Sequence, residues 1–460
     1  MSGIYMGAFL GMLSETSMNI ALPDLCVAFG VTTGTAQWMV VGYMLAIGIV
    51  LPCVGFLLKW IDTRRLLMGA LVLFLVGSLI SASASMFVVL LLGRMLQGVG
   101  TGIILPTLYA SMIHVFRPME LGAANGVAGL VIMFAPVIGP TISGVMIGAF
   151  SWRSIFVLFA VIAFLALVLA RVFFRSPIEI TRPRIDWPSV AGSIVGFGSL
   201  VAGIGFIPDM GLSPTVLALL VVGVGVLTFY IRRQLHVDNP VLDLKPLFLS
   251  GFRTPAIMVT LSFSCTLAFM YVAPQELQRG MGLDPSTAGM LMLAGGVTNA
   301  VFSFIAGRLY DRTGAGRLVR LGAAFSVVSS ILFIGIGTNS NPAFFVLAHV
   351  LLMIGIPLMQ QAAQSDALAN LPRELASDGS TILNTMQQVS GAIATAVVTL
   401  LLSSGYSDQL DVAQGFVNGS RYGYAFALLL IVLVAALSVV MRISVPDMDI
   451  DVVRENAEND

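Results

Sequence analysis

The chain has 460 residues, of which 57% are hydrophobic and 10% charged, and its 23 Lys and Arg balance its 23 Asp and Glu. Soluble domains carry roughly 25% charged residues, so this composition indicates a membrane protein. The absence of net charge argues against a nucleic-acid partner, and Cys26, Cys53 and Cys265 are too scattered for a disulfide framework or a metal cluster.

Long apolar segments follow one another along the whole chain. Each is close to the ~20 residues that a helix needs to cross ~30 Å of hydrocarbon. We therefore predict an all-α polytopic membrane protein with fourteen transmembrane helices. The segments cover residues 3–22, 36–58, 66–84, 87–113, 121–148, 154–174, 188–207, 213–231, 254–275, 286–307, 318–337, 343–364, 380–403 and 422–441.

The positive charges between these segments fall into alternate loops. Of the 23 Lys and Arg, Arg153, Arg279 and Arg421 alone lie in the opposite set of loops, and Arg94 lies inside a segment. Loops rich in Lys and Arg stay in the cytoplasm during membrane insertion. We therefore expect a multi-pass protein of the cell membrane with both termini in the cytoplasm.

The first segment carries Glu15, the single carboxylate near the middle of any predicted span. An acid at that depth costs about 2.5–3.5 kcal/mol on insertion scales, so it should face a cavity or a partner. A buried carboxyl group can exchange protons in a useful pH range, which suits proton coupling. The alternative is a structural carboxyl group that is hydrogen-bonded to a neighbour such as Asn19, one turn away.

The fourth segment contains Arg94, the single basic residue inside a predicted span. It should lie ~10 Å below the outer end of its helix, at a depth similar to that of Glu15. Gln97 and Thr101 follow at +3 and +7 and place hydrogen-bonding groups on the same helix face. We predict that these residues line one cavity with Asn19; the alternative is that Arg94 only braces helix packing.

Small residues and prolines mark the fifth segment, which reads "GLVIMFAPVIGPTISG" over 129–144. Gly139 and Gly144 permit close helix approach, and Pro140 removes a backbone hydrogen bond and bends the helix. Ordinary helix packing explains this pattern as well as a functional motif does.

Two similar turns follow the second and tenth segments: "GFLLKWIDTRR" begins at Gly55 and "GRLYDRTGAGR" begins at Gly307. Gly139 and Gly391 are separated by the same offset, which indicates an internal duplication. Fourteen helices without symmetry remain the alternative. The predicted domains are a six-helix bundle (1–174), linkers with a two-helix hairpin (175–250), a second six-helix bundle (251–441) and a cytoplasmic tail (442–460).

These two turns also carry a carboxylate beside arginines at a helix end. Such a cluster can hold one conformation and release it in another, so we predict a conformational latch. Simple topology signals explain the arginines equally well. The predicted latch residues are Asp62, Arg64, Arg65, Gly307, Asp311, Arg312 and Gly314.

His349 in the twelfth segment is the remaining candidate for the cavity. It could titrate or bind substrate, although a lone histidine is more often a satisfied hydrogen-bonding residue. The glutamines of the twelfth and thirteenth segments either line a pathway or join helices, and both alternatives stay open.

Several stretches resemble the major facilitator superfamily, and specifically its fourteen-helix drug/proton antiporters. The resemblance implies two six-helix bundles with an inserted hairpin, and a cavity lined mainly by helices 1, 4, 9 and 12. It also implies that Gly139, Pro140 and Gly144 form an antiporter motif at the seam between the bundles. The stretches are 13–23, 37–52, 93–106, 135–144, 151–156, 239–244 and 307–317.

The sequence departs from this family at two functional positions. The acid of the first helix usually occupies the position of Ser14, whereas here it is Glu15. In the turn after the second segment, Lys59 replaces the usual Asp, so the latch works from the second half alone or uses Asp62 instead.

We expect a proton-coupled exporter of amphipathic, cationic or zwitterionic drugs or toxic compounds that works by alternating access as a monomer. The sequence contains no metal-binding, nucleophile or phosphate-loop motif, so we expect no enzyme activity and no cofactor. Protons and small amphipathic substrates would be its partners. The alternatives are a proton-coupled transporter of a single nutrient and a non-transporting membrane sensor.

Overall fold

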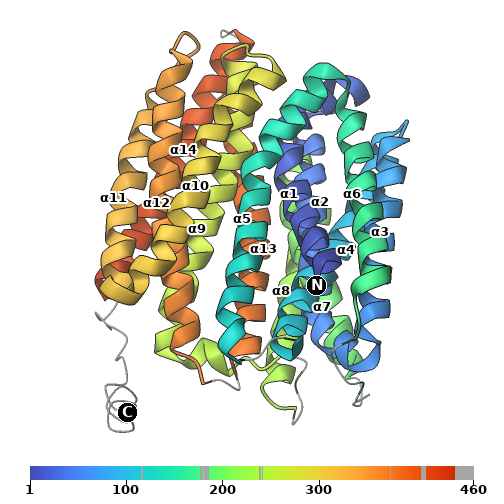
Figure 1. Ribbon diagram of the computed structural model, residues 1–460. Helices are drawn as coiled ribbons and strands as arrows, with labels where there is room; N and C mark the ends of the chain where they lie inside the picture. The colour runs from blue at the N-terminus through green and yellow to red at the C-terminus, as the bar shows by residue number, and fades with distance from the viewer. Residues whose placement is uncertain are drawn as a thin grey trace.

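The computed structural model describes residues 1–115, 118–176, 180, 186–237, 240, 242–372, 375–405 and 411–440, and the predicted tail lies outside them. Fourteen α-helices cover most of these described residues (Figure 1). A 3₁₀ turn, η1 (Lys245–Phe248), precedes α9, and a π-helical turn, η2 (Glu276–Gly280), follows it. The helices are α1 (Ser2–Phe29), α2 (Thr33–Trp60), α3 (Thr63–Ala82), α4 (Phe87–Val115), α5 (Pro118–Ala149), α6 (Trp152–Phe173), α7 (Trp187–Met210), α8 (Pro214–Gln234), α9 (Ser250–Gln275), α10 (Pro285–Thr313), α11 (Ala315–Ile334), α12 (Pro342–Ala369), α13 (Ala376–Ser404) and α14 (Val412–Val440).

Twelve helices of the described chain are long and apolar enough to cross a membrane. The other two, α1 and α5, are not among the twelve. The middle of α1 carries the polar run Ser14–Ser17, and the part of α5 that was assessed is a shorter apolar stretch over Phe134–Ala149. The structure thus confirms an all-helical polytopic protein, while fourteen membrane crossings stay a prediction.

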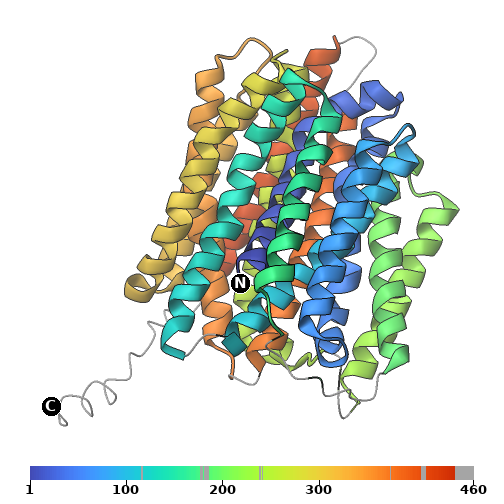
Figure 2. The same cartoon turned by 45° about the vertical axis from the view of Figure 1, so that its right-hand side comes forward.

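The helices pack in two groups that meet along two seams (Figures 1 and 2). In the first group, α1 contacts α5 and α6, while α4 contacts α2 and α3. In the second group, α9 contacts α12, α13 and α14, while α11 contacts α12 and α14. The α5–α10 and α2–α13 contacts join the two groups, and α1 also touches α9 between them.

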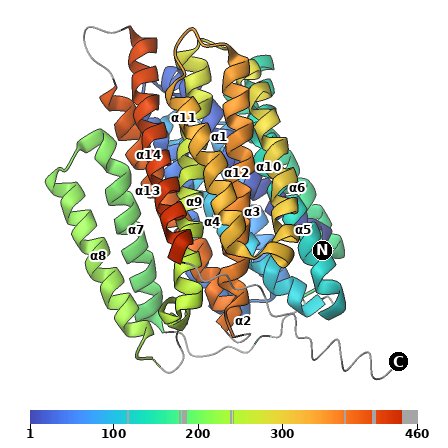
Figure 3. The same cartoon turned by 90° about the vertical axis from the view of Figure 1, so that its left-hand side faces the viewer.

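The hairpin of α7 and α8 lies outside both groups and covers one of these seams (Figure 3). Its first helix contacts α2 from one group and α13 from the other. The ring centroids of Trp38 on α2 and Phe206 on α7 lie 4.6 Å apart. By contrast, α8 turns side chains such as Val221 outward, 71% exposed, as a helix facing lipid would.

Backbone-to-backbone packing at glycine recurs at equivalent places in the two groups. A Cβ added at Gly77 of α3 would lie 2.5 Å from the carbonyl oxygen of Gly93 on α4. A Cβ added at Gly322 of α11 would lie 2.5 Å from the carbonyl oxygen of Gly355 on α12. Helices in lipid associate through such small-residue contacts. The third and fourth helices of each group are therefore held in the same way.

An arginine on the sixth helix of each group bonds the loop that follows the third helix. Arg153 of α6 donates to the carbonyl oxygen of Ala84 at 3.0 Å, and Arg421 of α14 donates to that of Ile336 at 3.2 Å. These loop positions have the same offset as Gly55 and Gly307. The shared contacts support the internal duplication that the sequence indicates.

Replacing Gly77 should destabilise the protein strongly, because its neighbours are backbone atoms that cannot move aside. We expect Gly77→Val to cost about 1–3 kcal/mol or more and to lower the yield of monodisperse protein. Gly69→Val on the same helix is the matched control, since nothing lies within 4 Å of a Cβ there. Thermal unfolding in detergent measures both variants, and equal melting temperatures would contradict this packing.

Candidate functional site

Arg94 is fully buried at the point where α1, α2 and α4 meet. Its guanidinium donates to the carbonyl oxygens of Met39 and Ser14, each at 3.1 Å, and also to the hydroxyl of Ser14. It further donates to the Gln97 amide oxygen at 2.9 Å. Its central carbon lies 4.0 Å from the ring centroid of Tyr43, which suits a cation–π contact. Each of the three guanidinium nitrogens of Arg94 therefore bonds a partner inside the first group.

The neighbours of Arg94 extend this network along α4. The Gln97 amide donates to the hydroxyl of Ser78 on α3 at 2.7 Å. The Tyr43 hydroxyl donates to the carbonyl oxygen of Gly11 at 2.8 Å and pairs with the Thr101 hydroxyl at 2.7 Å. Gln97 and Thr101 thus lie on the face of Arg94, and together they tie α4 to its three neighbours.

Glu15 is 4% exposed and is separate from this network. Within the described chain, it forms no ion pair with Arg94. Successive helix residues point about 100° apart, so the adjacent Ser14 takes the place beside the guanidinium. The Gln388 side chain of α13 lies beside the Glu15 carboxyl group instead. Glu15 therefore faces the interface between the two groups.

Three buried polar atoms near this interface have no protein partner in the described chain. They are Oε2 of Glu15, Oδ1 of Asn19 and Oε1 of Gln388. Buried polar atoms are normally hydrogen-bonded, and the exceptions often mark functional sites. Gln388 lay outside the predicted site, because a glutamine in a membrane helix is as often structural as functional.

His349 lies apart from these residues, among aromatic rings of the second group. Its imidazole centroid is 5.0 Å from that of Phe269 on α9, and its ring fills the space over Gly295 on α10. The side chain is 2% exposed and its Nδ1 has no partner in the described chain. The structure therefore places His349 in a packed cluster and does not bring it to Glu15.

The small residues of α5 contact both groups. A Cβ at Gly139 would lie 2.4 Å from the Thr16 hydroxyl on α1, and one at Gly144 would lie 2.4 Å from the Pro285 carbonyl oxygen on α10. The carbonyl oxygen of Pro140 lies 2.7 Å from the position of a Cβ at Gly289. The motif over 135–144 thus lies along the α5–α10 seam.

The first predicted latch sits within one group. Asp62 caps α3 by accepting from the backbone N–H of Arg65 at 3.0 Å, and the Ser176 hydroxyl also donates to it. The hydrogen bond from Ser176 lowers the pKa of the Asp62 carboxyl group below its usual value. Arg64 donates to the carbonyl oxygen of Arg171 at the end of α6. A cavity of about 610 Å³ opens here, lined by Asp62, Arg64, Arg65, Met68, Arg171, Arg175 and Ser176.

The second predicted latch is described only in part. Gly314 ends α10 with a φ of 71°, a conformation that favours glycine, and nothing lies within 4 Å of a Cβ at Gly307. Arg312 is exposed, and the side chain of Asp311 lies outside the described residues.

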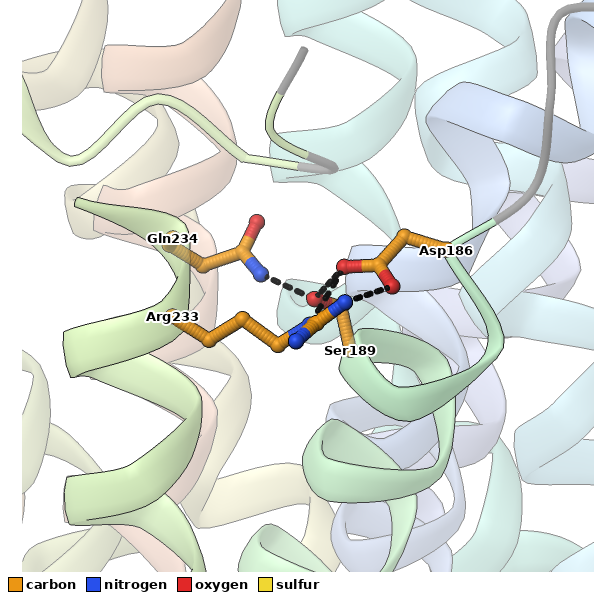
Figure 4. A network of polar contacts seen from close by, with 4 residues as sticks. All are labelled: Asp186, Ser189, Arg233 and Gln234. Atoms are coloured by element: carbon orange, nitrogen blue, oxygen red, sulfur yellow. Dashed lines mark hydrogen bonds and ion pairs between the residues drawn. The ribbon is translucent and has the colours of Figure 1, made fainter. Parts of the chain in front are cut away.

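A polar network closes the α7–α8 hairpin at one end (Figure 4). Arg233 donates to both carboxylate oxygens of Asp186, at 2.7 and 2.8 Å. The Ser189 hydroxyl also donates to Asp186 and accepts from the Gln234 amide at 2.5 Å. Sequence reasoning missed this network, because "RPRIDWP" had the composition of a linker.

Taken together, the helix packing and the buried polar site define a polytopic membrane protein of the transporter type. Residues 4–395 match the model of the Major Facilitator Superfamily, and the chain belongs to this superfamily of transporters.

Curated relatives align over most of the chain. The lincomycin resistance protein of Bacillus subtilis is 36% identical over 450 residues, which cover 94% of this chain and 93% of the relative. The lincomycin resistance protein of Listeria monocytogenes is also 36% identical, over 411 residues that cover 89% of this chain and 87% of the relative. A multidrug resistance protein B homolog of Mycobacterium tuberculosis is 26% identical over 415 residues, 89% of this chain and 76% of the relative.

Solved structures share the fold at low sequence identity. A POT family transporter in complex with 5-aminolevulinic acid superposes with a TM-score of 0.72 at 15% identity, covering 95% of this chain and 94% of that one. A D-xylose-proton symporter superposes with a TM-score of 0.66 at 16% identity, covering 94% of this chain and 95% of that one.

Removing Arg94 should destabilise the first group, because several buried partners lose their donor at once. We expect Arg94→Ala to cost on the order of 3 kcal/mol and to lower the melting temperature in detergent. Arg153→Ala removes one bond, to the Ala84 carbonyl oxygen, from a more exposed side chain and serves as the control. Similar losses from both variants would mean that the buried network contributes little.

The Asp186–Arg233 pair should stabilise the hairpin in a pH-dependent way. Hydrogen bonds from Arg233 and Ser189 lower the pKa of Asp186 from its usual 3.8, so its contribution to stability is full above that pH. It is lost as the pH falls through the lowered value. We expect Asp186→Asn to melt below wild type at neutral pH, and the difference to shrink in acid. A difference that stays constant down to about pH 3 would contradict this contribution.

Proposed function

We propose that the protein exports amphipathic, cationic or zwitterionic drugs in exchange for protons. The observation that carries this proposal is Glu15, a carboxyl group buried inside α1 without an ion-pair partner in the described chain and facing α13 of the other group. A carboxyl group in that position can hold either a proton or a cationic substrate, but not both. Competition for Glu15 would therefore couple the two flows.

The surroundings of Glu15 support substrate binding at the same place. Asn19 and Gln388 each present a buried oxygen without a protein partner in the described chain, and both can accept hydrogen bonds from a substrate amine or hydroxyl. Partly buried Met12 and Met386 pack around the core of the same helices, and methionine adapts to apolar surfaces of different shapes. The lincomycin and multidrug resistance relatives support drugs as the substrate class.

Arg94 takes a different part in this mechanism from Glu15. Its four hydrogen bonds go to residues of α1, α2 and α4, so it fixes the helix that carries Glu15 and adds a positive charge nearby. That charge favours the ionised carboxylate and opposes the effect of burial. Arg94 therefore acts as a positioning residue with an electrostatic influence on proton coupling.

Alternating access would follow from movement of α1–α6 against α9–α14. The two groups touch along the α5–α10 and α2–α13 seams, and glycine at both seams permits sliding at close range. Arg64 and Arg65 at the start of α3 and Arg171 at the end of α6 support a cytoplasmic position for this side of the protein, and with it for both termini. Because one chain contains both groups, we propose that the monomer is the working unit, in the cell membrane and without a cofactor.

The decisive test is Glu15→Gln in proteoliposomes with an imposed pH gradient. The substitution keeps the size and hydrogen bonding of the side chain but removes its titratable proton. We expect normal folding and a fall of at least about tenfold in proton-driven efflux of lincomycin or a fluorescent cationic dye. Glu15→Asp should retain part of the activity, because its charge persists about one methylene out of place.

Asp284→Asn is the matched control, because Asp284 only caps the start of α10 through Thr287. It should transport at the wild-type rate. Wild-type efflux and proton counterflow in Glu15→Gln would remove this residue from the coupling mechanism. Uptake of a single nutrient without any drug efflux would instead identify an importer.

A further inference from the structure

A second buried carboxyl group lies in the other half of the protein, at the junction of α9 and η2. Glu276 is fully buried, and one of its oxygens accepts from the Tyr424 hydroxyl of α14. Its other oxygen, Oε1, has no partner in the described chain. An ionised carboxylate in an apolar interior needs a partner charge or several donors. This environment therefore suits a neutral, protonated Glu276.

No described Lys or Arg forms an ion pair with Glu276. Arg421 is a described positive charge that acts on the Glu276 carboxyl group, and its Nε is buried without a partner in the described chain. The remaining titratable groups on the packed elements are occupied elsewhere or uncharged. Arg279 of η2 bonds Thr33, Asp284 caps α10, and Tyr271 of α9 is a neutral phenol. At the end of α1, Asp24 interacts electrostatically with Arg279, and Cys26 interacts with Tyr271.

The turn that carries Glu276 also joins the two helix groups. Gln278 donates to the carbonyl oxygen of Ile20 on α1 at 3.1 Å, and Arg279 donates to the Thr33 hydroxyl of α2 at 2.8 Å. Both bonds connect the second group to the first at the end of α1 and the start of α2. Gln278 and Arg279 both belong to the π-helical turn η2. Such turns are rare and often mark functional sites.

We propose that Glu276 is a second proton-binding site, which holds the outer side closed when protonated and opens it when the proton leaves. This proposal goes beyond export itself and uses only the alternating access of the proposed function. On release of the proton to the outside, the carboxylate draws in water and the free Nε of Arg421. The π turn then moves with Glu276, and the bonds from Gln278 to α1 and from Arg279 to α2 break.

Distances between spin labels test this mechanism without any transport assay. Val27 at the end of α1 and Val412 at the start of α14 are exposed, at 86% and 68%, and belong to different groups. Both would be labelled in a protein without its three native cysteines and measured in nanodiscs between about pH 5 and pH 9. We expect wild type to lengthen this distance at high pH.

Glu276→Gln keeps a neutral side chain of the same size, so it should hold the short distance at every pH. Glu15→Gln is the matched comparison and should keep the pH-dependent opening even where it abolishes export. Tyr424→Phe removes the donor to the carboxylate and should move the opening to higher pH by about one unit. Tyr424→Phe keeps the aromatic ring, so it provides a second test of the proposal if Glu276→Gln folds poorly.

The proposal is overturned if wild type shows no pH-dependent change in distance, or if Glu276→Gln opens with the wild-type pH dependence. If the pH-dependent opening is lost in Glu15→Gln and kept in Glu276→Gln, then Glu15 and not Glu276 controls the opening of the outer side. Failure of drug export in every protein, with these distance changes intact, would leave the Glu276 mechanism standing and refute the proposed substrate class.

Discussion

Close backbone contact at small residues is the constraint on which this structure depends. Lipid is as apolar as leucine, so two membrane helices gain little free energy by burying leucine side chains against each other. Gly77 against Gly93 and Gly322 against Gly355 instead bring peptide groups into direct contact. These contacts hold the helices of each group together, as the proposed movement of one group against the other requires.

The polar interior follows from the same packing. Because α1 is hemmed in by helices of both groups, its polar residues are buried on every side. Ser14 faces Arg94 within its own group, and Glu15 faces α13 across the interface. An acid at the position of Ser14 would therefore face Arg94, whereas Glu15, one residue further on, faces the partner half.

Composition, hydropathy and repeated turns predicted the helical architecture, the inserted hairpin and the placement of Arg94, Gln97 and Thr101 on one helix face. These features depend on local periodicity, which a single sequence contains. Sequence did not separate His349 from Glu15, and it left open whether the glutamines of α13, Gln388 among them, line a pathway or join helices, because such proximity depends on how distant helices dock. Glu276 directly follows the predicted segment 254–275, and its burial was not predicted, because that burial depends on α14 and a π turn that no sequence pattern indicates.

The α7–α8 hairpin makes the two seams differ in their exposure to the surrounding lipid. The hairpin lies over the α2–α13 seam, with Phe206 packed on Trp38. It therefore separates this seam from the surrounding lipid. Among the described residues, no hairpin lies over the α5–α10 seam, which is on the side of the molecule opposite α7 and α8 (Figure 3). The two flanks thus present different surfaces to a lipid-soluble molecule: the paired rings of Trp38 and Phe206 on one side, and the close contact of Gly144 and Gly289 on the other.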